Sequence, residues 1–257
     1  MTRMVTFTST LVALAWLGST AVVAAERLSV TGSLWPPYLD TELPNGGLAA
    51  DIVRTALTRA GYEIEPNIES WSRAYQGTAV GVYDVVAAVW QNEARDADLL
   101  FSDADLLNDI VFLARKGVLV DFDTLDDLKG LRIGVVREYA YDDAFDSDPE
   151  LTRFPNNHLI QNLLLLRQGR LDVVVGDKWS ILYQISYFMP DDLSDFYLVP
   201  KALTRRALRL GVSRQNGRAQ EIADAFDAAV AAMKEDGSFE EIVRRHTDRI
   251  AVLPGKR

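Results

Sequence analysis

Arg95 and Asp177, two residues of opposite charge, follow two similar segments of the chain. Residues 81–86 and 169–174 both read Gly-x-x-Asp-Val-Val, and a tryptophan follows each segment. In each copy the glycine ends a predicted helix and the aspartate begins a predicted strand, which indicates two similar α/β units. Ligands of open parallel sheets bind outside the carboxyl ends of the strands. The sequence therefore predicts that Arg95 and Asp177 face each other across a cleft, an arrangement suited to binding a charged solute.

The residue types that several other chemistries need are absent or badly spaced. The chain has no cysteine, and its two histidines, His158 and His246, lie far apart without a partnering carboxylate motif. Neither a thiol nucleophile nor a zinc site is expected from this pattern. No GxSxG, P-loop or GxGxxG motif occurs. We therefore expect no metal and no cofactor.

The overall charge argues against nucleic acid as a partner. The chain has 257 residues, with 27 Lys and Arg against 37 Asp and Glu, so its formal net charge is -10. Affinity for nucleic acid depends on cations that neutralise phosphates, and no basic block occurs. The composition is that of a globular protein, and the length allows two lobes that each bury a core.

Residues 1–25 have the pattern of a secretory signal peptide. Arg3 precedes an apolar run at 11–17, and small residues follow at 21–25. The alternative is a membrane anchor, but the run is shorter than the roughly 20 residues that a span needs. Cleavage is expected after Ala25. Without a cysteine for lipid attachment, the mature chain is expected free in a bacterial periplasm, with no membrane insertion.

Patterning along the rest of the chain predicts alternating strands and helices. In the first half these are a strand at 27–34 that stops at two prolines, helices at 48–60 and 72–80, and a continuous apolar strand at 84–90. In the second half they are strands at 131–136, 172–175, 196–199 and 207–212, and helices at 157–168, 222–237 and around 239–243. This order is typical of α/β architecture.

Several segments, ordered along nearly the whole chain, match one family. They are LWPPY, GGLAADIVRTAL, GVYDVVAAVWQNEAR, FSDADLLNDIVFLARKG, TLDDLKGLRIGVVREYA, LLLLRQGRLDVVVGDKWSILYQI and LRLGVSRQNGRAQEIADAFDAAVAAMKEDGSFEEIVRRH. With them the chain resembles the bacterial extracellular solute-binding proteins of family 3, the polar amino-acid type that serves ABC transporters. The resemblance implies a two-lobed α/β fold, periplasmic-binding-protein-like (type II), with a hinge and an interlobe ligand cleft.

The same resemblance implies the lobe boundaries. Lobe 1 would comprise residues 26–115 and a return segment at 205–257, and lobe 2 residues 116–204. The crossing strands would lie near 112–116 and 201–207.

The resemblance also implies roles for three residues. In that family the arginine at the position of Arg95 binds the ligand α-carboxylate, the aspartate at Asp177 binds the α-ammonium, and an aromatic residue at Trp35 stacks on the ligand. A planar guanidinium fork matches a carboxylate, and a fixed carboxylate attracts an ammonium, so the chemistry agrees. Each residue also has a structural alternative: Arg95 as a surface ion pair, Asp177 as a helix cap, and Trp35 as the packing of a turn.

The chain departs from the family pattern at positions that face the carboxylate. The family usually supplies small Ser or Thr donors where this chain has Ala88 and Trp90, and a Gly/Ser-Thr turn at 138–140. More aromatic residues and fewer small donors suggest a ligand that is larger, flatter or more cationic than a standard amino acid. One hypothesis is an aromatic box for a cation, built from Trp35, Trp71, Trp90, Tyr139 and Trp179.

Four further residues are candidates for ligand contact: Trp71, Arg73, Trp90 and Tyr139. Trp71 and Arg73 are expected at a helix start near the cleft, whereas Trp179 fits the core better than the ligand site. With Arg95, Asp177 and Trp35, these residues complete the predicted ligand-binding set.

The predicted function is non-catalytic capture of a small polar solute, an amino acid or a related amine or carboxylate, for delivery to an ABC transporter permease. Such a binder works as a monomer. Two alternatives stay open. One is a periplasmic dehydratase of the cyclohexadienyl type, in which Asp177 or Glu138 donates a proton. The other is a ligand-sensing protein that signals to a membrane receptor.

Overall fold

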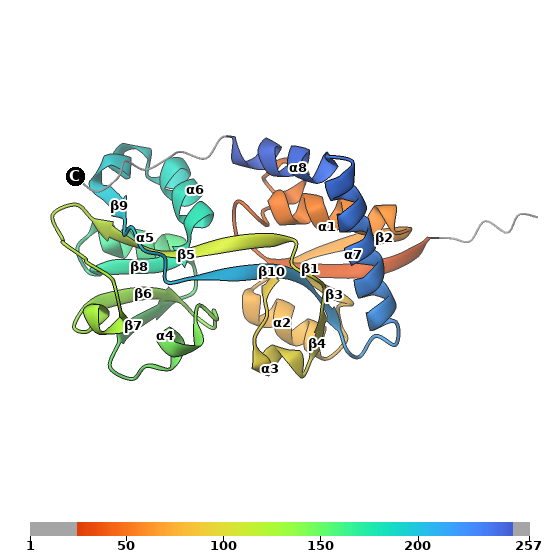
Figure 1. The fold of residues 1–257 in the computed structure, drawn as a ribbon, viewed down its shortest axis with the longest axis horizontal. Coiled ribbons are helices and arrows are strands. Elements are labelled where there is room, and N and C mark those ends of the chain that lie inside the picture. The colour runs from red at the N-terminus through yellow and green to blue at the C-terminus, as the bar shows by residue number, and fades with distance from the viewer. Residues whose placement is uncertain (1–24, 249–257) are drawn as a thin grey trace, which may run out of the picture.

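The structure is a computed structural model that describes residues 25–248. The predicted signal peptide therefore lies outside the described residues, apart from Ala25, and the first strand begins directly after it, at Glu26. Two α/β halves lie side by side and are connected by two long strands (Figure 1).

The first half holds β1 (Glu26–Ser33), α1 (Leu48–Arg59), β2 (Tyr62–Glu69), α2 (Trp71–Ala79), β3 (Val85–Trp90), α3 (Glu93–Asp96), β4 (Leu99–Phe101) and the start of β5 (Leu106–Arg115). The second half holds β6 (Arg132–Val136), α4 (Asp143–Ser147), β7 (Thr152–Asn156), α5 (Leu159–Arg167), β8 (Val173–Asp177), α6 (Lys178–Phe188) and β9 (Phe196–Leu198). The chain then returns through β10 (Thr204–Ser213) to α7 (Ala219–Glu235) and α8 (Ser238–Thr247). We call β1–β4, α1–α3, α7 and α8 the first lobe, and β6–β9 with α4–α6 the second lobe.

One hydrogen-bonded sheet runs through both lobes in the order β2-β1-β3-β10-β5-β8-β6-β7. β5 and β10 are the crossing strands, and they pair antiparallel between Leu106 and Ile110 on β5 and Thr204 and Leu208 on β10. From Ile110 onward β5 pairs with β8 of the second lobe. The first crossing therefore lies earlier in the chain than the predicted 112–116, whereas the second overlaps the predicted 201–207.

Hydrophobic periodicity located most of the long elements. Leu48, Ile52 and Ala56 share the buried face of α1, as the four-residue spacing predicts. All six residues of β3 are buried, as expected for a strand covered on both faces. The strands β2 and β7, the two outer strands of the sheet, were not predicted from the sequence.

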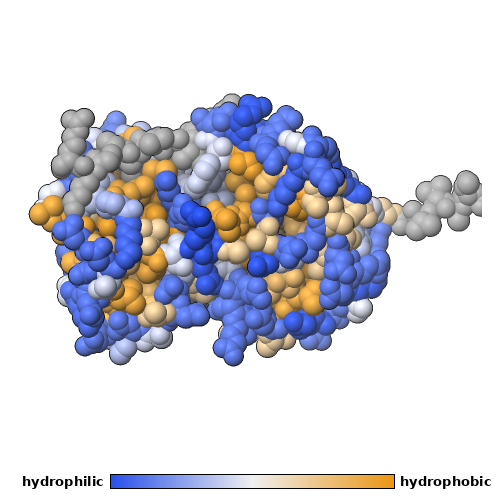
Figure 2. Space-filling view, in the orientation of Figure 1, coloured by the Kyte–Doolittle hydropathy of each residue, from blue (hydrophilic) through white to orange (hydrophobic). Residues whose placement is uncertain are grey.

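The core continues across the junction of the lobes. One buried apolar cluster contains residues of both lobes, among them Ile52 on α1, Phe112 on β5 and Val173 on β8. A second cluster lies within the second lobe under α5 and α6, around Leu163 and Ile185. The face seen in Figure 2 is mostly hydrophilic, with separate hydrophobic patches on both halves. Within residues 25–248 no helix is both long enough and apolar enough to cross a bilayer.

Candidate functional site

A cleft of about 600 Å³ lies between the two lobes. Its walls are the segments that follow β1 and β2 in the first lobe and β6, β7 and β8 in the second, so it lies at the carboxyl ends of strands from both lobes. The charged and polar side chains that line it belong to Ser33, Asp40, Glu69, Ser70, Ser72, Arg137, Asn157, His158, Asp177 and Gln184. Trp35, Trp71, Tyr139, Tyr141 and Phe188 supply its aromatic lining.

A second, much smaller cavity of about 20 Å³ shares three of these aromatic residues. It is lined by Ser33, Trp35, Trp71, Ala88, Trp90, Arg95 and Tyr139. Because Trp35, Trp71 and Tyr139 line both cavities, they form the partition between the cleft and the Arg95 guanidinium.

Arg95 lies in the short helix α3, directly beyond β3, and only 6% of it is exposed. Asn92 caps this helix by accepting a hydrogen bond from the Arg95 backbone N–H at 3.0 Å. The guanidinium donates to the Trp90 carbonyl and, at 3.2 Å, to the Glu138 carbonyl of the second lobe. It forms no ion pair with a carboxylate of residues 25–248. Burial lowers the pKa of Arg95 to about 10, so the group keeps its charge at neutral pH.

The ring of Trp71 lies 4.7 Å from the Arg95 guanidinium carbon, in cation–π geometry. Trp35, Trp90 and Tyr139 contact one another, with ring centroids 5.2–6.1 Å apart. Four of the five residues of the predicted aromatic box therefore line the small cavity together with a cation, the protein's own Arg95, and Trp71 is the one of the four that stacks on it. Trp179 does not line either cavity and packs against the main core, as expected.

Asp177 ends β8 and begins α6, and it lines the cleft from the second lobe with 2% of its surface exposed. One carboxylate oxygen accepts the Ser180 backbone N–H at 2.8 Å, which caps α6. The hydroxyl of Tyr38 also donates to this oxygen, and the amide of Asn108 donates to the other, both at 3.0 Å. Burial raises the pKa of Asp177 to about 6 against these lowering bonds. Asp177 therefore caps α6, the structural alternative considered for it, and also lines the cleft.

Tyr38 and Asn108 are site residues that the sequence reading missed. The Asn108 side chain also accepts the Trp90 indole N–H at 2.8 Å, so a buried polar chain runs from Asp177 to the aromatic cluster. Tyr38 is held by its own backbone, because its carbonyl accepts the Ala49 N–H at the start of α1. Gly47 makes this approach possible, since a Cβ there would lie 2.7 Å from the Tyr38 carbonyl oxygen. The only feature of the sequence that could have pointed to Asn108 is its polar side chain within the mostly apolar strand β5.

Arg73 lies elsewhere than expected. Its side chain is 80% exposed and pairs at 3.8 Å with Glu69, the last residue of β2, and it lines neither cavity. It lies on α2, whose first residue Trp71 faces the site, and two positions along a helix turn a side chain to a different face. We therefore leave Arg73 out of the proposed site.

Two residues of the site have positive φ angles without being glycine: Ala88, at +58°, and Glu138, at +63°. Such angles cost roughly 1–3 kcal/mol and persist only where the surroundings impose them. Both are positions where the chain departs from the family pattern. No group of three or more His, Asp or Glu side chains in residues 25–248 is arranged to hold a metal ion.

Two α/β lobes, two crossing strands and a cleft at the strand ends define a periplasmic binding protein fold of type II. The chain belongs to the bacterial extracellular solute-binding proteins, family 3, whose family model matches residues 30–249.

Curated relatives are distant. The putative ABC transporter arginine-binding protein 2 of Escherichia coli (strain K12) is 23% identical over 238 residues, which cover 88% of this chain and 93% of that protein. The sensor protein EvgS of the same organism is 24% identical over 176 residues, or 65% of this chain. The match spans only 14% of the length of that sensor.

Solved structures share the fold. A mutant of ArgBP from T. maritima superimposes with a TM-score of 0.73 at 19% identity, covering 87% of this chain and 96% of the other. The GluR0 ligand-binding core from Nostoc punctiforme, in complex with (L)-glutamate, gives 0.73 at 16% identity over 86% and 99% of the two chains. A histidine kinase sensor domain gives 0.72 at 20% identity over 90% and 99%.

Proposed function

We propose that this protein captures a small solute with a carboxylate group, an amino acid or a close relative, in the periplasm and delivers it to an ABC transporter. The observation that carries the proposal is Arg95, a buried guanidinium between the lobes that has no carboxylate partner in the described chain. A buried charge is costly unless it is paired. A ligand carboxylate would supply the missing partner in a bidentate geometry.

Asp177 and the aromatic residues support the rest of the assignment. The carboxylate of Asp177, which lines the main cleft and not the small Arg95 cavity, is suited to an ammonium group of the same solute. Trp35 and Trp71, in the partition beside Arg95, offer flat apolar surfaces to its side chain. The name of the arginine-binding relative agrees with a solute that carries a carboxylate and cationic groups.

The first experiment is a thermal-shift screen of the chain from Glu26 to Arg257, stripped of carried-over solute by unfolding and refolding. The panel holds amino acids, polyamines, quaternary amines, small carboxylates and aromatic acids. A ligand present at a hundred times its Kd stabilises a protein by roughly 2.7 kcal/mol, which is readily seen. If no compound with a carboxylate raises the melting temperature, the proposal is contradicted.

Arg95→Ala tests the assignment, with Arg73→Ala as a matched control because Arg73 is an exposed arginine outside the site. Losing charge-assisted bonds of about 3 kcal/mol weakens binding roughly a hundredfold, measured by calorimetry. Arg73→Ala is expected to bind as the wild type does. Equal affinity in the wild type and Arg95→Ala would remove the carboxylate assignment.

A catalytic function is the second candidate, and one observation favours it: a cleft carboxylic acid, Asp177, with a pKa raised by burial to about 6. A group of this kind can act as a general acid near neutral pH. The test is turnover of a cyclic hydroxy acid such as prephenate, with Asp177→Asn as the inactive variant. Turnover that survives in Asp177→Asn, or none at all, would dismiss this candidate.

A further inference from the structure

Two N–H donors of the Arg95 guanidinium bond to backbone carbonyls that come from different lobes. The Trp90 carbonyl belongs to the end of β3, beside Arg95, whereas the Glu138 carbonyl reaches across from the loop after β6 at 3.2 Å. Two oxygen acceptors on one guanidinium reproduce what a carboxylate offers. A ligand carboxylate that binds Arg95 through both NH groups therefore competes with Glu138, the partner contributed by the other lobe.

Tyr139, the next residue, occupies the space between the aromatic residues of the first lobe. Its ring centroid lies 5.5 Å from that of Trp90, 6.1 Å from Trp35 and 6.4 Å from Trp71, each in edge-to-face geometry. It lines both the cleft and the small Arg95 cavity. The ring thus stands in the path by which a solute in the cleft would reach the guanidinium.

Contacts across the lobes hold this segment in an unfavourable backbone conformation. Glu138 has a φ of +63°, which a non-glycine residue adopts at a cost. Its carboxylate accepts a hydrogen bond from the Ser72 hydroxyl at the start of α2, while its carbonyl accepts from Arg95. Residues 138 and 139 are therefore anchored to the first lobe by a side chain, a carbonyl and an aromatic ring.

We propose that Glu138 and Tyr139 form an internal competitor for the ligand site, in which the Glu138 carbonyl takes the place of the ligand carboxylate and the Tyr139 ring that of its side chain. This inference rests on the proposed role of Arg95 in binding a carboxylate. A solute binds by displacing both groups, so its apparent Kd is the intrinsic Kd divided by the fraction of molecules in which they have withdrawn. Tyr139 then sets which solutes bind at all.

The first test needs no ligand. The chain has no cysteine, so Gln76→Cys on α2 and Ala144→Cys on α4, both at exposed positions of different lobes, can be spin-labelled without background. The distance distribution between the labels is measured by pulsed electron paramagnetic resonance in refolded, solute-free protein. Tyr139→Ala is expected to shift the distribution toward longer distances. Tyr187→Ala, the same change at a tyrosine that is 68% exposed on α6, is expected to leave it unchanged.

The second test measures affinity by calorimetry for L-arginine, L-phenylalanine and L-glutamate. If Glu138 and Tyr139 occupy the ligand site in nine molecules out of ten, removing the ring in Tyr139→Ala tightens binding about tenfold. Weaker binding in Tyr139→Ala would make Tyr139 a wall of the ligand site, and an unchanged distance distribution would likewise overturn the proposal. If none of the three probes binds either protein, the amino-acid function fails, while the distance measurement still decides on the competitor.

Discussion

Asp177 accepts three hydrogen bonds, from Ser180, Tyr38 and Asn108. These bonds limit how many hydrogen bonds a ligand can make to the carboxylate. An ionised carboxylate offers about four acceptor positions, so at most one is left for a ligand. At the residue scale the site is thus already built and rigid on the Asp177 side. On the Arg95 side the partners are backbone carbonyls, one of which comes from the other lobe.

The raised pKa of Asp177 predicts how binding depends on pH. The ionised form attracts an ammonium, and with a pKa of about 6 it is lost as the pH falls through that value. Arg95, with a pKa of about 10, stays charged over the same range. The Kd of a zwitterionic solute such as L-arginine is therefore expected to rise about tenfold for each pH unit below 6. Calorimetry between pH 4.5 and 8 measures this.

Asp177→Asn is the variant for this prediction, because Asn can still cap α6 and accept hydrogen bonds. It is expected to bind more weakly at pH 8 and to show a flat profile down to pH 5. A profile as steep as that of the wild type would assign the titration to another group.

Residues of the site differed in how far the sequence could predict them. Arg95 and Asp177 were predicted because each lies at the end of a recognisable buried strand. Tyr38 was not, because its role depends on Asp177, 139 residues later in the chain, and no local pattern reports such a contact. The aromatic residues were found as a group, but the sequence could not show that the cation they surround is Arg95.

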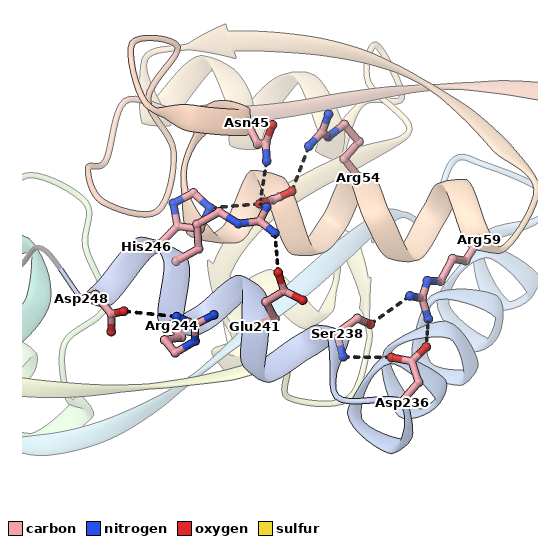
Figure 3. A network of polar contacts seen from close by, with 11 residues as sticks. Asn45, Arg54, Arg59, Asp236, Ser238, Glu241, Arg244, His246 and Asp248 are labelled. Atoms are coloured by element: carbon pink, nitrogen blue, oxygen red, sulfur yellow. Dashed lines mark hydrogen bonds and ion pairs between the residues drawn. The ribbon is translucent and has the colours of Figure 1, made fainter.

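At the scale of elements, the last helix is attached to the first through one buried carboxylate. Asp51 on α1 accepts hydrogen bonds from Asn45, at 3.0 Å, and Arg54, at 2.9 Å, and pairs with Arg245 and His246 of α8 at 3.2 and 3.1 Å (Figure 3). Burial alone would raise the pKa of Asp51. The hydrogen bonds to the carboxylate, of which that from Asn45 has the largest effect, outweigh burial, so the pKa is lowered. Its stabilising contribution is therefore present above about pH 4 and is lost below.

Asp51→Ala leaves the cationic and imidazole groups of α8 without their buried partner. Arg54 and Arg245 are about half exposed, so solvent compensates part of the lost interaction, and a loss of about 1–3 kcal/mol in the free energy of unfolding is expected by urea denaturation. Hydrogen exchange in α8 is expected to accelerate. Glu240→Ala, at an exposed position of the same helix, serves as the control. A loss below about 0.5 kcal/mol would mean that apolar packing and the Arg59–Ser238 hydrogen bond are enough to attach α8.

Two of the strands that were not predicted from the sequence share a physical property. β2 and β7 are the outer strands of the sheet, each contains a proline, and most of their residues are exposed or half-buried. An edge strand needs no apolar pattern on its free side and tolerates proline, because it has no partner there to accept its backbone N–H groups. Most of the long helices and buried strands were predicted, since packing into a core imposes a period on them.

At the scale of the whole molecule, buried acids determine how stability changes with pH. Asp105, in the turn before β5, is buried, and burial raises its pKa to about 7. The folded state therefore binds one proton more than the unfolded chain between about pH 4 and 7. Each pH unit gained in this window lowers the free energy of unfolding by about 1.4 kcal/mol on account of Asp105.

Asp105→Asn is expected to lose this slope and to gain stability over the wild type at pH 8, as measured by urea denaturation at pH 5, 6, 7 and 8. The exposed Asp191→Asn is expected to keep the slope of the wild type. An unchanged slope in Asp105→Asn would show that Asp105 does not titrate in this window. Below pH 4 the groups with lowered pKa values, Asp51, Asp172 and Asp236, reverse the trend.

The position of β10 between β3 and β5 also has a consequence for the order in which the two lobes can fold during synthesis. The strands β1, β2 and β3 are made first, yet their neighbour β10 and the covering helix α7 come from residues 204–235, near the end of synthesis. The second lobe is one uninterrupted stretch, and all its strands, together with its neighbour β5, are made before then. The N-terminal lobe is therefore completed last. A polypeptide that crosses a membrane unfolded, amino end first, would reach the far side before its leading half could close into a stable unit.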